Sequence, residues 1–292
     1  MRVALNIVVF GCLFQGQVAL AMPITFNTAL PVSKDEIIFR EQLVLDKSRS
    51  PDTTRDTRTE VTSVTTVGYG FTPDLAVFVS APYTSRAVDM ASTTRAGRGF
   101  GDAELFARYT VYQHDAPGET FRISPFAGVK VPTGETNARD HRGKLPASVQ
   151  AGSGSWDVFG GAIVTYASTD YTVDGQIGYR ENRRGNGSET GDIIRADASL
   201  QYRLWPETLD INTSGFFYGV LETNLVHQEK TRLAGVADAN TGGTTLTIVP
   251  GVQYATRRWV AELALQIPVH QNLNGNALRN DYQLRTGIHV NF

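Results

Sequence analysis

Apolar and polar residues alternate along most of the chain after residue 35, in runs of roughly ten to fourteen residues separated by breaks. A period of two is typical of a β-strand with two unlike faces, because successive side chains point to opposite sides of a pleated sheet. No window carries an apolar stripe of helical period over three turns, so helices are expected to be minor. The pattern predicts strands at 35–47, 57–70, 75–85, 101–113, 119–132, 154–167, 171–181, 191–204, 209–224, 243–256, 258–270 and 281–292.

The breaks between these runs are alternately short and long. The short breaks are 71–74, 114–119, 168–170, 206–209 and 257–258; the long ones are 48–56, 86–100, 133–153, 182–190, 225–242 and 271–280. Barrels of the bacterial outer membrane have short periplasmic turns and long outer loops, with strands of about 9–11 residues across the bilayer. We therefore predict an all-β fold, a transmembrane antiparallel up-and-down β-barrel of about 12 strands.

Charged residues recur on the polar faces of the predicted strands. An Arg or Lys that faces the middle of the bilayer costs about 2–4 kcal/mol, so these residues are expected to face the lumen. They have two open roles: ion pairs that fill a narrow barrel, or a lining that orders a passing solute. The lumen-lining candidates are Arg40, Asp102, Glu104, Arg108, Arg122, Lys130, Asp174, Arg180, Arg195, Asp197, Arg203, Glu262, Arg285 and His289.

Basic residues also collect in two of the long breaks. Two interpretations of these outer loops stay open: binding of lipopolysaccharide phosphates, and selection of a solute. The outer-loop candidates are Arg95 and Arg98 in break 86–100, and Arg139, His141 and Arg142 in break 133–153.

The first residues predict a cleavable secretory signal peptide. Arg2 is the positive residue, an apolar stretch follows, and Ala19-Leu20-Ala21 fits the cleavage site. The predicted organisation is a signal peptide at 1–21, a periplasmic segment at 22–34 and the barrel at 35–292. Cys12, the single cysteine of the chain, lies in the signal, so no disulfide is expected in the mature protein. Lipidation of Cys12 is disfavoured, because the apolar stretch continues beyond it.

Composition and motifs argue against several other functions. A net charge of −2 gives no case for nucleic-acid binding. The chain has neither the G-x-S-x-G pattern of serine hydrolases nor the H-E-x-x-H pattern of zinc enzymes. We expect no enzymatic activity, no metal and no cofactor. A membrane-embedded hydrolase and a secreted soluble β protein remain weaker alternatives.

Several stretches resemble a known family. "VGYGFTPDLAVFVSAPY" (67–83), "GFGDAELFARYTVYQ" (99–113), "FAGVKVPTGE" (126–135) and "GSGSWDVFGGAIVTY" (152–166) occur in the same order as in the outer-membrane transporters named after the meta-pathway of phenol degradation. The resemblance covers roughly residues 60–292. It implies an outer-membrane location and uptake of aromatic or other hydrophobic compounds, and it supplies no catalytic or ligand residues.

The leading hypothesis is an outer-membrane channel of a Gram-negative bacterium for passive passage of small solutes, hydrophobic or aromatic ones among them. The expected partners are outer-membrane lipid, lipopolysaccharide, the outer-membrane insertion machinery and a small solute that the sequence does not identify. The alternative is a closed structural or adhesive outer-membrane barrel that acts through its extracellular loops.

The carboxyl-terminal residue predicts an assembly signal. Phe292 follows apolar residues at every second position of the last strand, as in segments that the insertion machinery reads. We expect deletion of Phe292 to lower the amount of assembled protein in outer-membrane fractions while solute binding by the refolded protein is unchanged. Normal assembly of the truncated chain would contradict the signal.

Overall fold

The computed structural model describes residues 21–51, 57–90, 93–208 and 213–292, so the predicted signal peptide lies almost entirely outside the described residues. Within these ranges, no helix is long and apolar enough to cross a membrane. The strands are β1 (Ile37–Arg49), β2 (Thr57–Gly70), β3 (Leu75–Met90), β4 (Thr93–Phe100), β5 (Ala103–Tyr109), β6 (Tyr112–Ala116), β7 (Glu119–Val131), β8 (Arg139–Asp140), β9 (Gly143–Lys144), β10 (Asp157–Ser168), β11 (Tyr171–Glu181), β12 (Ser188–Glu189), β13 (Ile193–Trp205), β14 (Gly215–Gln228), β15 (Arg232–Leu233), β16 (Val236–Ala237), β17 (Gly243–Thr256), β18 (Trp259–Leu273) and β19 (Arg279–Asn291).

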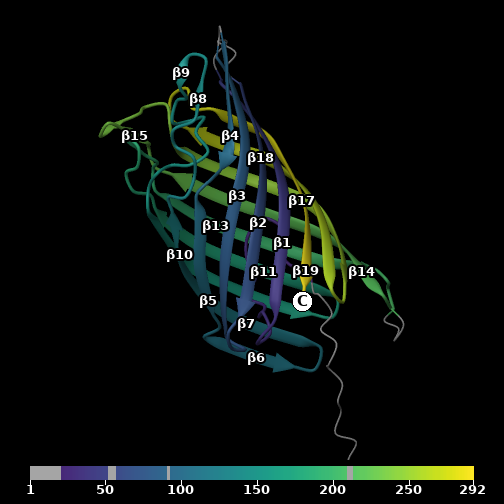
Figure 1. Cartoon of the computed structure of the whole chain (residues 1–292). Coiled ribbons are helices and arrows are strands. Elements are labelled where there is room, and N and C mark those ends of the chain that lie inside the picture. The colour runs from purple at the N-terminus through teal and green to yellow at the C-terminus, as the bar shows by residue number, and fades with distance from the viewer. Residues whose placement is uncertain (1–20, 52–56, 91–92, 209–212) are drawn as a thin grey trace, which may run out of the picture.

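Twelve of these strands form a closed antiparallel barrel (Figure 1). Their order around the wall is β10, β11, β13, β14, β17, β18, β19, β1, β2, β3, β5 and β7, and β7 pairs with β10 to close the sheet. β4 and β5 both pair with β3, so β4 extends the position of β5 in the wall at one end. β5 and β6 both pair with β7, so β6 extends that position at the other end. The fold class predicted from the alternation is confirmed.

The two ends of the barrel differ. One end, which we call the turn end, carries the tight connections between β2 and β3, β6 and β7, β10 and β11, and β17 and β18, together with the carboxyl-terminus (Figure 1). The opposite end, the loop end, carries the small hairpins of β8, β9, β12, β15 and β16. At the turn end Gly118 has a φ of 81°, which allows the hairpin between β6 and β7 to turn tightly.

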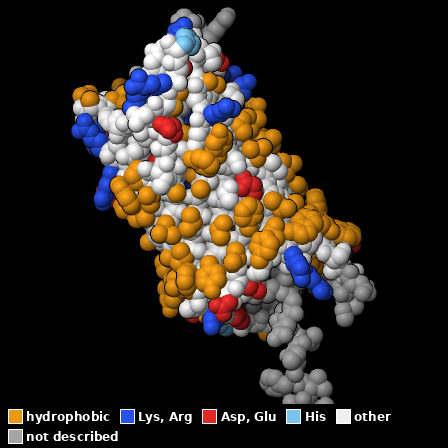
Figure 2. Space-filling model, viewed as in Figure 1, with side chains coloured by type: hydrophobic (Ala, Val, Ile, Leu, Met, Phe, Trp, Pro, Cys, Tyr) orange, Lys and Arg blue, Asp and Glu red, His pale blue; other side chains and the backbone are white. Residues whose placement is uncertain are grey.

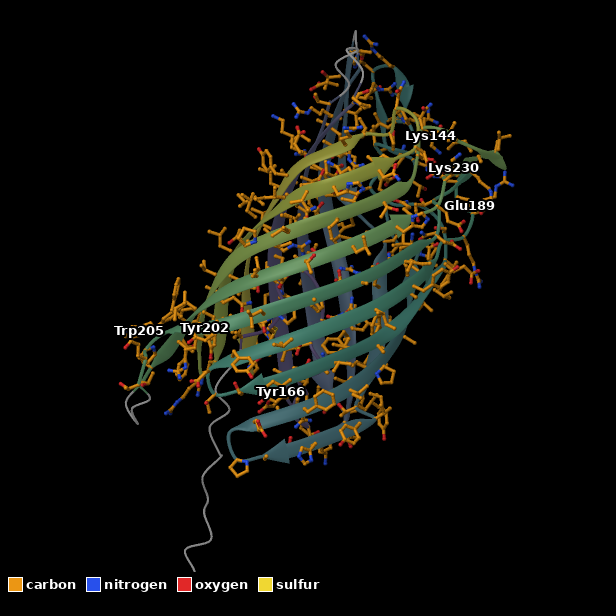
Figure 3. All side chains as sticks on the ribbon, turned by 180° about the vertical axis from the view of Figure 1, so that it is seen from behind. Lys144, Tyr166, Glu189, Tyr202, Trp205 and Lys230 are labelled. Atoms are coloured by element: carbon orange, nitrogen blue, oxygen red, sulfur yellow. The ribbon has the colours of Figure 1, made fainter. Side chains whose placement is uncertain are left out.

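The outside of the wall is apolar and the inside is polar. Figure 2 shows hydrophobic side chains spread over the flank, with charged side chains mainly toward the two ends. Tyr166, Tyr202 and Trp205 lie toward the turn end in Figure 3, whereas Lys144 and Lys230 lie at the loop end. This distribution places aromatic rings at one border of the apolar band, where membrane proteins have them.

The predicted long break at 86–100 is wrong, because most of it is paired β-structure. The outer part of β3 pairs with β4, from Tyr83 with Phe100 to Met90 with Thr93. The outer parts of β1, β2, β3 and β4 extend together at the loop end (Figure 1). The stretch is typical of a loop because its Gly, Asp and Ala residues have low strand propensity, whereas pairing is set here by the continuation of β3 along β2.

The predicted run 209–224 also differs from the structure. Residues 209–212 lie outside the described residues, and β14 covers Gly215–Gln228. The break predicted at 225–242 therefore starts later and contains the short strands β15 and β16. The alternation is weak in "GFFYG", where aromatic residues stand on both faces, so it could not fix the start of the strand.

The sequence predicts that the segment before β1 is periplasmic. In the structure this segment lies inside the barrel. Ala21, Ile24 and Ala29 are fully buried, and they contact side chains that point inward from the wall. No local pattern indicates this position, since a short segment after a signal peptide is typical of a linker. We call residues 22–34 the luminal segment; Ala21, directly before it, is the last residue of the predicted signal peptide.

The apolar outer face leads to a stability prediction. Leu200 lies near the middle of β13 and is 42% exposed on the outer face, so Leu200→Arg would set a charge against hydrocarbon. We expect it to lower the free energy of unfolding in lipid vesicles by about 2–4 kcal/mol. Ala96→Arg, on the exposed face of β4 above the wall, is the matched control and should leave stability unchanged. Urea titrations followed by tryptophan fluorescence measure both; equal stability of the two variants would contradict an outer face set in lipid.

Candidate functional site

The luminal segment crosses the interior and contacts strands on opposite sides of the wall. Ile24 packs with Val220 on β14 and Val249 on β17. Ala21, directly before the segment, packs with Tyr218 on β14 and Val260 on β18. On the other side Val32 packs with residues of β3 and β5, namely Ala76, Phe78 and Phe106. The barrel therefore has an apolar core that is built around its own amino-terminal segment.

A buried carboxylate on β14 holds the first part of this segment. Glu222, whose exposed fraction is 1%, accepts hydrogen bonds from the backbone N–H groups of Ile24 at 2.6 Å and Thr25 at 3.1 Å. The hydroxyl of Thr25 also donates to Glu222, and Ser199 Oγ lies 3.2 Å away. Because these donors are neutral, the carboxylate is solvated by the segment rather than by a cation.

The second part of the segment is held by β5, β10 and β11. The guanidinium of Arg108 donates to the carbonyl oxygens of Thr28 and Leu30, and it stacks over the Phe78 ring with 5.2 Å to the centroid. The Thr28 hydroxyl donates to Asp174 at 2.8 Å, and the Ala29 N–H donates to Thr165 at 2.8 Å. Wall side chains thus replace the water that an extended backbone would otherwise bind.

Strands β1 and β18 supply a third anchor. Arg40 donates to both oxygens of Glu262, at 2.9 and 3.1 Å, and to the carbonyl oxygens of Pro23 and Ile24. Gln42 Nε2 lies 3.0 Å from the Ile24 carbonyl and 2.7 Å from Glu262. Arg40 on β1 and Glu262 on β18 thus form an ion pair across β19. Arg40 links this ion pair to the luminal segment through the backbone carbonyl oxygens.

Glycines in the wall leave room for the segment. A Cβ on Gly251 would start 2.9 Å from Ile24 Cδ1, and a Cβ on Gly70 would start 2.1 Å from the Ser33 carbonyl oxygen. Any larger residue at these positions would push the segment away from the wall. Glycine inside an otherwise regular strand is the one signal in the sequence that could have indicated a close backbone approach.

The other lumen-lining candidates form local pairs. Lys130 lies between Asp102, at 3.5 Å, and Asp157. Arg180 pairs with Glu104 at 2.7 Å, and Arg195 with Asp197 at 2.7 Å. At the turn end Arg122 lies 3.6 Å from Asp115, Arg203 pairs with Asp170, and His289 is buried opposite Arg40 in the ladder between β1 and β19.

The basic residues of the loop end separate into two groups. Arg95 is mostly buried, and it donates to Asp140 at 2.5 Å and to the Lys144 carbonyl oxygen at 3.1 Å. Partial burial raises the pKa of Asp140, but the Arg142 N–H and the Arg95 guanidinium outweigh this and the pKa is lowered. The remaining candidates, Arg98, Arg139, His141 and Arg142, are exposed.

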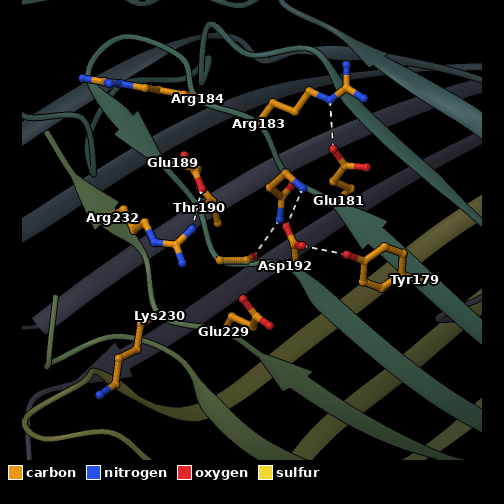
Figure 4. Close-up of a pocket in the computed structure, with 12 residues that line it drawn as sticks. Tyr179, Glu181, Arg183, Arg184, Glu189, Thr190, Asp192, Glu229, Lys230 and Arg232 are labelled. Atoms are coloured by element: carbon orange, nitrogen blue, oxygen red, sulfur yellow. Dashed lines mark hydrogen bonds and ion pairs between the residues drawn. The ribbon is translucent and has the colours of Figure 1, made fainter. Parts of the chain in front are cut away.

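Two cavities open toward the loop end. One, of about 390 Å³, lies between β11, β12 and β15, and two ion pairs line it, Arg232 with Glu189 and Arg183 with Glu181 (Figure 4). The other, of about 420 Å³, is inside the barrel. We call it the vestibule; its lining residues are Thr25, Ser48, Arg58, Arg195, Asn224, Val226, Gln228, Gly242, Gly243, Thr245, Thr247, Gln266, Gln271, Leu273, Ala277, Leu278, Asn280 and Arg285.

The vestibule ends on the luminal segment. Thr25 is part of its lining, and the same residue donates to Glu222. A solute that enters from the loop end would therefore meet the segment before it reaches the turn end. No group of three or more metal-ligating side chains that could hold an ion occurs among the residues that the structure describes.

Comparison with known proteins identifies one family and several similar solved structures. Residues 51–270 match the model of the family described as "Putative MetA-pathway of phenol degradation". An outer membrane channel from Pseudomonas putida F1 is 14% identical, with a TM-score of 0.70 over 90% of this chain and 98% of that one. The β domain of the Bordetella autotransporter BrkA is 9% identical, with a TM-score of 0.50 over 88% of this chain and 100% of that one. No curated protein matches the chain.

The anchor at Glu222 can be tested by chemical labelling. The predicted mature chain has no cysteine, so Ile24→Cys would introduce a unique thiol beside this anchor. Glu222→Ala removes the carboxylate and leaves buried N–H groups unpaired, at a cost of about 1.5–3 kcal/mol for each charged hydrogen bond. We expect a water-soluble maleimide to label the introduced thiol about tenfold faster in the Glu222→Ala background.

Ala96→Cys is the control for that measurement. It lies on the exposed face of β4 and should be labelled at the same rate with or without the Glu222→Ala substitution. Heat-modified gel migration confirms that each variant is folded. An unchanged labelling rate at position 24 would mean that Glu222 does not hold the segment in place.

Proposed function

The chain belongs to this phenol-degradation family, and we propose that it is a channel of the bacterial outer membrane through which small solutes diffuse passively. The observation that carries the proposal is the inverted distribution of side chains. On the outer face Ile177 is 65% exposed and Leu221 is 53% exposed, whereas Gln253 inside the barrel is fully buried. A water-soluble protein has the opposite arrangement, and a closed barrel in lipid requires this one.

The outer face is compatible with the hydrocarbon layer even where it carries an acid. Glu41 points outward from β1, and its carboxylate accepts hydrogen bonds from Ser63 and from Thr65 at 2.6 Å. Its charge is therefore solvated within the wall. Arg98, Arg139 and Arg142 are exposed at the loop end, which supports the proposal that they bind lipopolysaccharide phosphates.

Solute passage is proposed to occur through the vestibule and past the luminal segment. The vestibule is lined mainly by hydroxyl and amide side chains, which form a wetted entrance. Ion pairs inside the barrel, such as that of Arg40 with Glu262, fix the wall and the segment, so we propose that they serve mainly to fill the lumen. The family description supports small aromatic or other hydrophobic compounds as the solute class.

A closed structural or adhesive barrel is the second candidate. It is favoured by the course of the luminal segment, whose apolar residues pack against β14, β17 and β18 on one side and β3 and β5 on the other. It is also favoured by the paired hairpins at the loop end, because an adhesive barrel would act through such structured loops. The two candidates differ in one measurable property, a continuous path for ions.

Planar-bilayer recordings and liposome swelling separate the candidates. We expect the refolded chain to give discrete conductance steps and to let a small aromatic alcohol enter liposomes faster than a disaccharide of larger cross-section. Liposomes that hold the β domain of an unrelated, plugged barrel are the control for leakage. Absence of both conductance and solute entry would contradict the channel and favour the closed barrel.

A further inference from the structure

Three arginines line the vestibule, and two of them have carboxylate partners. Arg58 pairs with Glu60, which also binds Arg86 at 2.8 Å. Arg195 makes two hydrogen bonds with Asp197, at 2.7 and 2.9 Å, from the same strand. The acids next to these two arginines are therefore fully used, and the vestibule has an excess of positive charge.

The third arginine, Arg285 on β19, has no carboxylate partner within salt-bridge distance among the described residues. Its Nη1 donates to Gln42 Oε1 at 3.0 Å, and its Nη2 donates to Gln283 Oε1 at 3.3 Å. Both acceptors are neutral amides. Its Nε–H is buried and has no hydrogen-bond partner among the residues that the structure covers.

The surroundings of Arg285 do not supply the missing anion. Its cross-strand neighbours are Val44 and Ala264, which are apolar and buried. The nearby acids already have other donors: Glu262 is bound by Arg40 and Gln42, Glu222 by the luminal segment, and Asp46 by Ser48 and Gln283. A guanidinium stays charged at every physiological pH, so this position carries a positive charge with no carboxylate in direct contact among the described residues.

The remaining lining suggests what kind of anion fits. Val226, Leu273 and Leu278 line the vestibule toward its opening, at the ends of β14 and β18 and in the loop after β18. Arg285 lies further inside, in the middle of β19. The cavity thus offers apolar contact near the entrance and a charged donor at depth, with a volume of about 420 Å³.

We propose that the vestibule is a binding site for small carboxylates with an apolar body, such as aromatic carboxylates, and that Arg285 binds the carboxylate. The Nε and Nη2 atoms of an arginine form the edge that binds a carboxylate through two parallel hydrogen bonds. In this structure the amide oxygen of Gln283 occupies part of that edge, through the long contact of 3.3 Å. Gln266 also donates to this oxygen, so Gln283 keeps a partner when a carboxylate takes its place.

This inference rests on the proposed channel, because it assigns a class of solute to the channel's entrance. It does not depend on passage to the turn end. A carboxylate can bind in the vestibule whether or not the luminal segment moves, so binding and transport are measured separately.

The test is binding of benzoate to the refolded full-length mature chain in detergent, measured by titration calorimetry. Benzyl alcohol serves as the neutral analogue and acetate as the carboxylate without an apolar body. We expect benzoate to bind more tightly than either, and Arg285→Gln to raise its dissociation constant by at least about tenfold. Arg285→Lys keeps the positive charge but not the pair of parallel N–H donors. Its dissociation constant for benzoate should lie between those of the wild type and Arg285→Gln.

Arg180→Gln is the matched control. It removes one positive charge from the lumen, but Arg180 pairs with Glu104 and does not line the vestibule. It should leave benzoate binding unchanged. Equal affinity for benzoate and benzyl alcohol, or equal loss in Arg180→Gln and Arg285→Gln, would overturn the site.

A parallel bilayer recording distinguishes this proposal from the channel itself. Benzoate added on the loop side should reduce the ionic current of the wild type more than that of Arg285→Gln. Benzoate binding without any conductance would uphold the site and contradict the channel. Conductance with no benzoate binding that depends on Arg285 would uphold the channel and contradict the site.

Discussion

A backbone amide or carbonyl group that faces hydrocarbon has no water to bind, so every wall strand of this protein must be paired along both edges. The pairing of β7 with β10 and of β1 with β19 meets this requirement, because it joins the sheet into a ring. Closure in turn divides each strand into an outer and an inner face. The apolar outer face and the polar lumen follow from that division. The luminal segment and the vestibule both lie on the inner side.

Closure also creates an interior that must be filled. Twelve strands enclose more space than inward side chains occupy alone, and here the luminal segment takes up part of it. The segment brings unpaired backbone groups into a site with little water, and Glu222, Thr165, Arg108 and Gln42 satisfy them. Several charged residues of the lumen therefore solvate backbone, whereas Arg285 has only neutral amides as partners.

Much of the wall could be predicted from the sequence, because a strand with lipid on one side and polar groups on the other has a strict period of two. The run 171–181 corresponds residue for residue to β11, and 57–70 to β2. The hairpin at 86–100 was missed because strand pairing above the membrane does not need an apolar face. Whether residues 22–34 fill the lumen could not be predicted, because their contacts are with residues up to 231 positions away, which no local pattern records.

The position of the luminal segment has a consequence for the order of assembly. The segment precedes β1, and β1 pairs with β19 across almost the whole length of the chain, which makes this seam the costliest contact to close in chain entropy. Glu222, Thr165 and Arg108 lie on separate strands and converge on the segment after the sheet has curled. Threading it into a finished ring would strip water from its backbone before any partner was within reach. The luminal contacts and the closing seam therefore depend on each other: the anchors meet around the segment only in a curled sheet, and the segment fills the space that closure of β1 on β19 encloses.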